Sequence, residues 1–265
     1  MAPKPEWTIS ESAWLTEIKL PTSALLPALV EKVFVRYPLY AWRGHRCADW
    51  KLEPTLGRKT TSGGKRVTPQ RSQLHLQDFK LFTRGRLIET PATEDEWWAL
   101  GQHHGLATPL LDWTSSPFVG AYFAFIGQGI HQTAQRAIWG LSRSGIHHCS
   151  RRIVREWRSK KRRGNPPVVE LVRSGLFAGN KRLLSQSGMF TKAPDGLDLE
   201  TWSKLYAARH FPDRVLLVKI LIPDADREPC LRMLDRMNIN HHSLFPDVDG
   251  AARYCNTILE IDKYH

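Results

Sequence analysis

The chain has 265 residues, of which 42% are apolar and 24% charged, and this composition is typical of a folded globular protein. The length suits one large domain or two small ones, and the composition argues against a disordered, collagen-like or disulfide-scaffold protein. The unusual quantity is the charge, because 38 Lys and Arg stand against 26 Asp and Glu, for a net charge of +12. Such an excess suits a polyanionic partner, above all nucleic acid, or a basic surface that only aids solubility.

Cysteine usage and hydropathy point to an intracellular protein. The four cysteines are widely spaced without a Cys-x-x-Cys pair, so neither a disulfide framework nor a zinc ribbon is expected. The first residues lack the apolar core of a secretory signal, and the most apolar stretch, residues 118–130, is too short to span a bilayer. We therefore expect a cytoplasmic protein with no membrane partner.

The first predicted element is a helix over residues 24–36. Its apolar residues recur at helical spacing, Thr22 is a possible N-cap, and Pro38 ends it. A short strand is predicted at residues 39–44. The glycines and cations of residues 57–71 then predict a mobile basic loop.

A second helix begins after Thr93. Thr93 and Glu96 have the spacing of a capping box, and Gly105 is typical of the residue that follows a helix end. This places His103 and His104 in the last turn, where the helix dipole favours a cationic imidazole.

The next segment predicts a strand, a polar turn and a helix in close succession. Residues 110–113 read as the strand, and Ser116 followed by Pro117 has the pattern of an N-cap and a first helical position. Apolar residues then continue at helical spacing to Phe125. Free backbone N–H groups at the start of this helix suit a phosphate.

The second half of the chain reads mainly as strands bounded by Gly or Pro, followed by two helices. The predicted strands are residues 136–141, 168–173, 188–192 and 214–222, and the closing helices are residues 229–238 and 250–260, with Asp247 or Asp249 as a cap. Between the first two strands, residues 151–163 predict a helix with cations over most of its surface. No internal repeat or clear linker is visible, which favours one α+β domain.

Several of these segments resemble the FRG domain family. Residues 102–114 read Gln-His-His-Gly-Leu-Ala-Thr-Pro-Leu-Leu-Asp-Trp-Thr and, with the Ser-Pro and Ala-Tyr-Phe-Ala that follow, are similar to the family signature. The Phe-Arg-Gly element that names the family corresponds to residues 42–44, with Trp in place of Phe. Residues 180–191 and 244–250 also resemble family blocks, whereas Pro109 stands where many members have Arg.

The order of the motifs is similar to that of ADP-ribosyltransferases, by analogy of pattern. Those enzymes place an Arg or His on an early strand, then a Ser, Thr or Tyr strand that leads into a helix, then a Glu-bearing strand. Arg43, Thr114 and Gln186 follow in that order. The resemblance implies one α+β domain over residues 1–265, with a central split, mostly antiparallel β-sheet flanked by helices. Within it, residues 1–38 form a helical region, and residues 57–71 and 143–165 are basic insertions.

The resemblance also implies roles for single residues, with NAD as the substrate that donates ADP-ribose and no metal. Catalytic roles are expected for Arg43, His104, Asp112 and Gln186, and contacts with NAD for Arg43, Gly44, Trp113, Thr114, Ser115 and Tyr122. The fork of Arg43 suits a phosphate or ribose, and the hydroxyls of Thr114 and Ser115 suit the nicotinamide ribose. Trp113 or Tyr122 would stack on the nicotinamide ring.

Asp112 is the carboxylate expected to stabilise the oxocarbenium-like sugar, because Gln186 cannot act as a base. Glu170 and Glu260 are alternatives without motif support. A structural interpretation remains open for each residue: Arg43 pairs with a buried Asp, Asp112 orients a ring of His103 or His104 or caps a turn, and the hydroxyls cap a helix.

Nucleic acid, with RNA favoured over DNA, is the expected target. The residues expected to bind it are Arg151, Arg155, Trp157, Arg158, Lys160, Lys161 and Arg162. The family setting implies a toxin-type enzyme in toxin–antitoxin or antiphage defence, with an antitoxin protein as a further partner. Because the basic segments lie outside the matched motifs, a neutral cleft around Arg43 is expected.

Two other functions remain open. One is a non-enzymatic nucleic-acid-binding module, and the other is a nuclease in which His104 and Asp112 act as an acid–base pair. Among metal sites, His147-His148-Cys149 is the best candidate, although adjacent histidines do not easily share one tetrahedral ion.

Overall fold

Eight strands form one sheet in the computed structural model, which describes residues 7–36, 39–87, 89–127, 134–173, 188–211 and 215–264. In chain order the strands are β1 (Thr8–Glu11), β2 (Leu15–Lys19), β3 (Tyr40–His45), β4 (Leu110–Thr114), β5 (Gln135–Ser142), β6 (Glu170–Arg173), β7 (Gly188–Lys192) and β8 (Leu217–Pro223). Their spatial order is β1-β2-β8-β5-β3-β4-β7-β6, and every neighbouring pair is antiparallel except β2 and β8. The predicted α+β fold with a mostly antiparallel sheet is confirmed.

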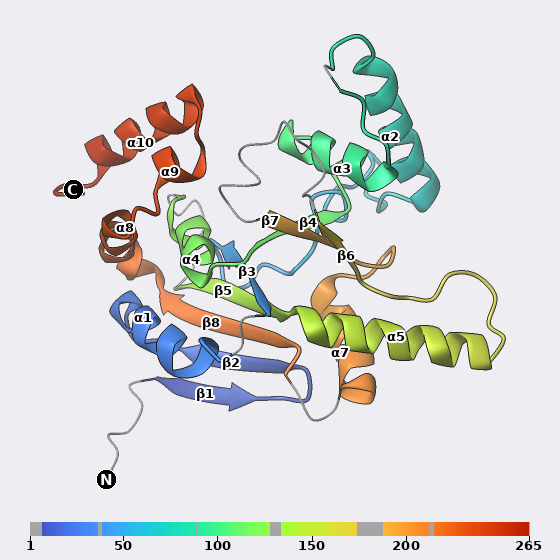
Figure 1. Cartoon of the computed structure of the whole chain (residues 1–265), viewed down its shortest axis with the longest axis horizontal. Helices are drawn as coiled ribbons and strands as arrows, with labels where there is room; N and C mark the ends of the chain where they lie inside the picture. The colour runs from blue at the N-terminus through green and yellow to red at the C-terminus, as the bar shows by residue number, and fades with distance from the viewer. Residues whose placement is uncertain are drawn as a thin grey trace.

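The sheet is nearly divided between β3 and β4. Strand β3 pairs with β5 along its whole length, but it meets β4 at one position, where Trp42 lies opposite Thr114. Beyond this join, β4 pairs fully with β7, which pairs with β6 (Figure 1). The predicted central split is therefore present as a narrow join between a five-stranded and a three-stranded part.

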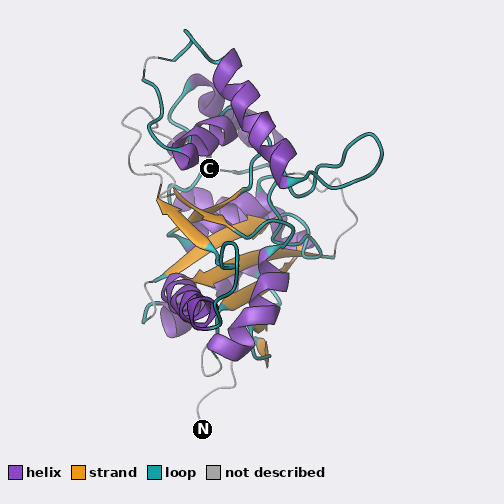
Figure 2. Cartoon of the chain, turned by 90° about the vertical axis from the view of Figure 1, so that its right-hand side faces the viewer, coloured by secondary structure: helices purple, strands orange, loops and turns teal. Residues whose placement is uncertain are grey.

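Helices cover both faces of the sheet (Figure 2). The helical elements are η1 (Ser23–Leu25), α1 (Leu26–Leu29), η2 (Val30–Phe34), α2 (Pro69–Phe82), α3 (Glu94–His103), α4 (Pro117–Phe125), α5 (Arg143–Ser159), α7 (Leu199–His210), η3 (Asp224–Asp226), α8 (Arg227–Arg236), α9 (His241–Leu244) and α10 (Val248–Glu260). Alternation along β5 separates two cores, because successive side chains of a strand point to opposite faces. Ile138 faces the core of α1, α4 and α8, whereas Trp139 faces the core of α5 and α7. A smaller third core joins α2 and α3 to β4 and β7.

Two glycines let α4 lie directly on β3. A Cβ atom on Gly44 would lie 2.1 Å from the carbonyl oxygen of Gly120 and 2.3 Å from the amide nitrogen of Ala124, so no larger residue fits. On the helix side, a Cβ on Gly120 would meet that of Trp42 at 3.2 Å. The glycine of the Trp-Arg-Gly element thus has a packing role, and it fixes the height of α4 above the strand that carries Arg43.

The predicted helix caps agree with the structure. Thr93 and Glu96 form the reciprocal capping box of α3, and the Ser116 hydroxyl accepts the Val119 N–H at the start of α4. Asp247 caps α10, and Gly105 has φ +84°, in the left-handed region expected after a helix end.

Several predicted boundaries were wrong. Residues 1–38 were expected to be helical, but they also contain β1 and β2, which extend one edge of the sheet. The basic loop of residues 57–71 runs into α2 at Pro69, and α5 begins at Arg143 instead of near Arg151. β1 is exposed at every position and so lacks the burial pattern that marks a strand. The described part of the chain contains no helix long and apolar enough to cross a membrane.

Candidate functional site

A cleft of about 750 Å³ opens where β3 and β4 part. Its described lining comes from β3, the end of β4, the start of β7, Gln102 of α3, the end of α4 with the two residues after it, the segment of residues 46–58, and the region of α9 and α10. The predicted residues Arg43, Gly44, Asp112, Trp113 and Thr114 all line it. Two segments that are distant in the sequence, the Trp-Arg-Gly element and the Leu-Asp-Trp-Thr strand, therefore meet at one cleft.

Arg43 is held in a fixed orientation at the wall of the cleft. Its Nε–H donates to His45 Nε2 at 3.0 Å, and its Nη1 donates to the Asp112 carbonyl oxygen at 2.9 Å. The Asp112 carboxylate lies 3.6 Å from the same Nη1, and the Arg43 side chain is 20% exposed. Burial lowers the pKa of the guanidinium from its usual value, Asp112 partly offsets this, and Arg58 lowers it further. Because arginine is not deprotonated in proteins, Arg43 remains a cation despite this shift. Its 20% exposure leaves part of the guanidinium available to a ligand.

His45 is a site residue that the sequence interpretation missed. It accepts from Arg43 at Nε2, and its Nδ1 lies 3.2 Å from the Trp50 carbonyl oxygen, so the proton belongs on Nδ1. Burial, with a contribution from Arg43, lowers the pKa of His45 to about 3, and the ring stays neutral. The signal that could have found it is strand periodicity, since residues two apart share a face of β3.

Asp112 is held by Gln102, which the sequence interpretation did not single out. The Gln102 side-chain amide donates to Oδ1 of Asp112, and its oxygen accepts from the Thr108 hydroxyl. The Asp112 side chain is 61% exposed. The ion pair with Arg43 thus exists, but it involves an exposed carboxylate at the cleft instead of a buried one.

Two further predicted residues of β4 are buried at the cleft and have structural partners. Trp113 is 2% exposed, and its Nε1–H donates to the Thr191 hydroxyl at 2.9 Å. Thr114 is 4% exposed, and its hydroxyl accepts the Ser116 N–H at 3.2 Å. The Thr114 hydroxyl therefore bonds within the turn that precedes α4, whose N-cap is Ser116, and Trp113 is not free to stack on a ring.

Three predicted residues lie outside the described lining of the cleft. Tyr122 was expected to face the nicotinamide, but it is fully buried in the core and its hydroxyl contacts Nδ1 of His241. Ser115 is exposed beside the join, and His104 is exposed at the C-cap of α3. The structure therefore does not bring His104 to the cleft with Asp112, as the nuclease hypothesis requires. Gln186 lies outside the described residues.

The start of α4, where a phosphate was predicted, lies outside the described lining of the cleft. Phe123, Ile126 and Gly127 line the cleft, and these belong to the C-terminal end of the helix. At the other end, Ser116 caps the helix and Pro117 has no N–H. Because the C-terminal end of a helix carries partial negative charge, an anionic group is expected away from α4.

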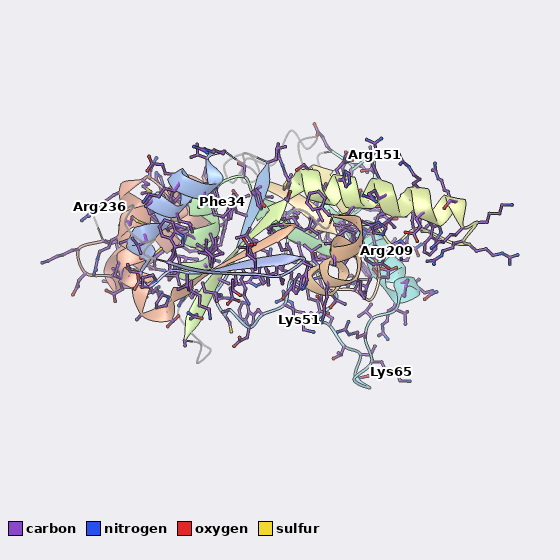
Figure 3. The ribbon with its side chains drawn as sticks, turned by 90° about the horizontal axis from the view of Figure 1, so that it is seen from below. Phe34, Lys51, Lys65, Arg151, Arg209 and Arg236 are labelled. Atoms are coloured by element: carbon purple, nitrogen blue, oxygen red, sulfur yellow. The ribbon has the colours of Figure 1, made fainter. Side chains whose placement is uncertain are left out.

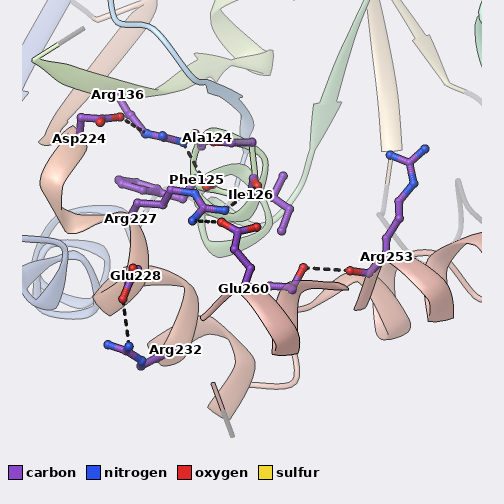
Figure 4. A network of polar contacts seen from close by, with 12 residues as sticks. Ala124, Phe125, Ile126, Arg136, Asp224, Arg227, Glu228, Arg232, Arg253 and Glu260 are labelled. Atoms are coloured by element: carbon purple, nitrogen blue, oxygen red, sulfur yellow. Dashed lines mark hydrogen bonds and ion pairs between the residues drawn. The ribbon is translucent and has the colours of Figure 1, made fainter. Parts of the chain in front are cut away.

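The cleft is cationic, in contrast to the expected neutral one. Two carboxylates, Asp112 and Glu53, belong to its described lining, against a larger set of cations: Arg43, Arg46, Lys51, Arg58 and Arg253. Arg253 extends away from α10 in Figure 4. Most of these cations follow the Trp-Arg-Gly element within fifteen residues, a local enrichment that the sequence could have shown.

The alternative carboxylates have other surroundings. Glu260 pairs with Arg227 at 2.6 Å (Figure 4), and Glu170 is exposed on β6, outside the described lining of the cleft. Glu53 is 15% exposed and pairs with Arg66 at 3.4 Å. Asp112 and Glu53 are therefore the carboxylates with access to a ligand.

The basic residues predicted to bind nucleic acid gather on α5. Arg151, Arg155 and Arg158 are exposed and recur every three or four residues, so they share one face of the helix about 5 to 6 Å apart. Lys160 is bonded to Glu156, which also accepts from Arg209 at 2.7 Å. Figure 3 shows Arg151 on the opposite side of the molecule from Lys51 and Lys65.

Trp157 lies in a pocket of about 470 Å³ at the end of α5. Its Nε1–H donates to the Gly164 carbonyl oxygen at 3.2 Å, and the Arg162 guanidinium lies 5.2 Å from its ring centre. Arg158 and Lys161 also line this pocket. The predicted cluster thus consists of an arginine row on α5 and a cationic pocket at the end of the helix, and Arg158 belongs to both.

No group of three or more His, Cys, Asp or Glu is arranged to hold a metal ion in the described part of the chain. Cys149 of the candidate His-His-Cys run is fully buried, and burial raises the pKa of its thiol to about 11. Its thiolate, the form that binds metals, is therefore disfavoured.

Comparison with known proteins finds a match over segments that help to build the cleft. No curated protein and no solved structure matches the chain. A family model described as FRG domain matches residues 38–132, a range that begins just before β3 and ends after α4. It includes Arg43, Gly44, Asp112 and Thr114, and it leaves β5 to α10 outside. The part of the chain that supplies the Arg43 wall of the cleft therefore matches the FRG domain model.

Proposed function

We propose that the protein is an NAD-dependent ADP-ribosyltransferase whose NAD site is the cleft at the β3–β4 join. The observation that carries the proposal is the fixed Arg43 at the wall of a cationic cleft, with Thr114 of the next motif in the same lining. The third motif of the analogy contains Gln186, two residues before Gly188, which also lines the cleft.

The chemistry of the lining fits the parts of NAD. Cations suit its diphosphate, and the half-buried aromatic residues Trp50 and Phe245 suit its rings. In the transfer, an O–H or N–H of the acceptor attacks C1 of the nicotinamide ribose, nicotinamide leaves with the electron pair of the broken C–N bond, and the acceptor loses its proton. A carboxylate beside the ribose stabilises the positive charge that develops there, and Asp112 is the better placed of the two because it adjoins Arg43.

We further propose nucleic acid, with RNA preferred, as the acceptor. The arginine row of α5 suits a phosphate backbone, and the apolar side of α5, with Ile146, Cys149 and Ile153, is buried against the sheet. A helix with no exposed apolar side has nothing to insert into a lipid surface, which favours nucleic acid over a membrane. Because Arg151 of this row lies on the opposite side of the molecule from Lys51, which lines the cleft, the row would bind the acceptor at a distance from the cleft (Figure 3).

The test is transfer from NAD labelled in its adenylate part. The protein is incubated with labelled NAD and separately with RNA, DNA and protein extract, and label and free nicotinamide are measured. Arg43→Lys keeps the charge but loses the fork of donors, and it should lower transfer at least about a hundredfold. Arg236→Gln, an exposed arginine of α8, is the control. Absence of both transfer and nicotinamide release in the unsubstituted protein would refute the activity.

A toxin role in antiphage or toxin–antitoxin defence follows from the same proposal. Induced expression should slow cell growth if the acceptor is an essential RNA, and Arg43→Lys should relieve the effect. A neutralising antitoxin protein is then expected as a partner. If the unsubstituted protein and Arg43→Lys are equally toxic, growth inhibition does not depend on transfer.

A second candidate is a nucleic-acid-binding module without catalysis, which the arginine row of α5 favours. Under this alternative Arg43→Lys leaves nucleic-acid affinity unchanged and no nicotinamide is released. Filter binding with the same RNA that is used in the transfer assay distinguishes the two functions.

A further inference from the structure

We infer that the segment of residues 46–58 and Arg43 together form a subsite for a diphosphate group, with Arg58 as its outer cation. This inference deepens the proposed function, and it rests on that function only in taking the diphosphate to be that of NAD. It places the diphosphate at the part of the cleft lined by Arg43 and by residues of the 46–58 segment, instead of at the start of α4.

The first observation is an excess of like charge at one place. Arg43 and Arg58 line the same cleft, and each contributes to lowering the pKa of His45. Arg58 also lowers the pKa of Arg43. Arg58 is exposed and the Arg43 side chain is 20% exposed, so an anion can reach both cations and reduce their mutual repulsion.

Neither carboxylate in the described lining of the cleft forms an ion pair with Arg58. Asp112 interacts with Gln102 and Arg43, and Glu53 lies 3.4 Å from Arg66. Each carboxylate thus has its own cationic or amide partner. Among the described residues no carboxylate pairs with Arg58, so its exposed guanidinium is available to an external anion.

The second observation is that the loop holds its cations on a fixed backbone. The Leu56 N–H donates to the Thr108 carbonyl oxygen at 3.0 Å, and the Thr108 N–H donates to the Thr55 hydroxyl at 3.0 Å. These bonds join the loop to the segment that precedes β4. The Arg58 N–H closes a turn on the Pro54 carbonyl oxygen at 3.2 Å, so the position of its Cα atom is set.

Arg46 is also held in place by its surroundings. Its guanidinium lies 5.7 Å from the centre of the Trp50 ring, and its side chain passes so close to Gly127 that a Cβ there would lie 2.2 Å from Cδ. Lys51 lies 3.9 Å from Asp198. Cations therefore stand on the β3 wall and on the loop, which suits a compact group with two or three negative charges more than a single sugar or a neutral ring.

Titration calorimetry with inorganic pyrophosphate tests the inference without any catalytic step. We expect pyrophosphate to bind the full chain more tightly than phosphate, and Arg58→Gln to weaken it about tenfold. Lys59→Gln is the matched control, because Lys59 is the adjacent exposed cation and lies outside the described lining of the cleft. Circular dichroism of both variants shows that they are folded.

The same titration with NAD separates the inference from the proposed function. Pyrophosphate binding that depends on Arg58, with no binding of NAD, supports the subsite and refutes the NAD site. NAD binding that Arg58→Gln leaves unchanged supports the NAD site and overturns the subsite. Absence of pyrophosphate binding, or equal weakening by Lys59→Gln, also overturns the subsite.

Discussion

The side chain of Arg43 donates to Nε2 of His45 at 3.0 Å, and this bond fixes both the direction of the guanidinium and the tautomer of the ring. Nδ1 of His45 in turn lies 3.2 Å from the Trp50 carbonyl oxygen, which joins β3 to the segment that follows it. A proton on Nε2 would leave Arg43 facing a donor. The Arg43 orientation therefore requires a neutral His45, and burial keeps it neutral by lowering its pKa.

The pH dependence of stability tests this relationship. The pKa of His45 is lowered to about 3 in the folded chain, whereas an unfolded chain has the ordinary value near 6.5. Below pH 6.5 the unfolded state binds a proton at His45 that the folded state does not. The free energy of unfolding therefore decreases as the pH falls from 6.5 toward 3. We expect a loss of roughly 1 kcal/mol per pH unit from this residue. Between pH 7 and pH 5, the free energy of unfolding in urea should decrease less for His45→Gln than for the unsubstituted protein. Equal decreases would contradict the low pKa of His45.

Substitution of the two cleft carboxylates tests the chemistry of the transfer. Asp112→Asn keeps an oxygen for Gln102 but removes the charge, and it should lower transfer about a hundredfold. Glu53→Gln should have an effect of less than about fivefold, because the charge of Glu53 is directed to Arg66. The measurement is the initial rate of nicotinamide release at saturating NAD. The reverse order would assign the carboxylate role to Glu53.

Removal of the buried Arg136 should destabilise the fold strongly. Its Nε–H donates to Asp224 at 2.6 Å, and Nη1 donates to the carbonyl oxygens of Ala124, Phe125 and Gly127, which closes the end of α4 (Figure 4). Arg136→Met leaves these acceptors without their donor and should cost about 3 kcal/mol or more in the free energy of unfolding.

An exposed ion pair is the control for Arg136. Arg253 lies 3.0 Å from Asp249, and their side chains are 62% and 58% exposed. Arg253→Gln should change the free energy of unfolding by less than about 1 kcal/mol. Similar losses for the two variants in thermal unfolding would contradict the structural role of Arg136.

The glycine of the Trp-Arg-Gly element should not tolerate a methyl group. Gly44→Ala places a Cβ against the backbone of α4, which cannot move without separating the helix from β3. We expect a loss of about 3 kcal/mol or more. Gly63→Ala is the matched control, because the nearest atom to its new Cβ is the Thr61 hydroxyl at 3.9 Å. Equal melting temperatures for the two variants would show that the close packing at Gly44 is not needed.

The arginine row of α5 predicts a salt-dependent interaction with single-stranded RNA. Substituting Arg151, Arg155 and Arg158 by Gln should reduce the slope of log affinity against log salt by about 2, at roughly 0.7 per phosphate contact. The control replaces three exposed arginines on other surfaces, Arg84, Arg86 and Arg236. If both triple variants change the slope equally, the interaction depends on net charge and not on α5.

Local features were predictable from the sequence because they depend on nearby residues. The capping box at Thr93, the cap at Ser116 and the left-handed Gly105 each involve hydrogen bonds or backbone angles within a few residues. Strand β7 was predicted with its observed bounds, Gly188–Lys192. The α+β class also followed from the order of such segments, whereas the mostly antiparallel sheet was implied by the family resemblance.

The composition of the cleft was decided by tertiary structure. Tyr122 lies in the motif segment and was expected to contact NAD. In the structure its side chain on α4 points into the core, where its hydroxyl contacts His241, more than a hundred residues away in the sequence. Arg58 and Arg253 reach the same cleft from separate parts of the chain. No local pattern encodes such meetings, because they depend on which strands pair and on which end of α4 faces the join.

The sequence by itself determined the large positive charge, the motif segments and their order. Only the tertiary structure decided where that charge acts, because β3 meets β4 at one position and the strands diverge from there. This divergence opens the cleft, and the segment after β3 brings Arg46, Lys51 and Arg58 to its wall. Part of the +12 charge, which the sequence placed outside the motifs, thus surrounds Arg43 itself.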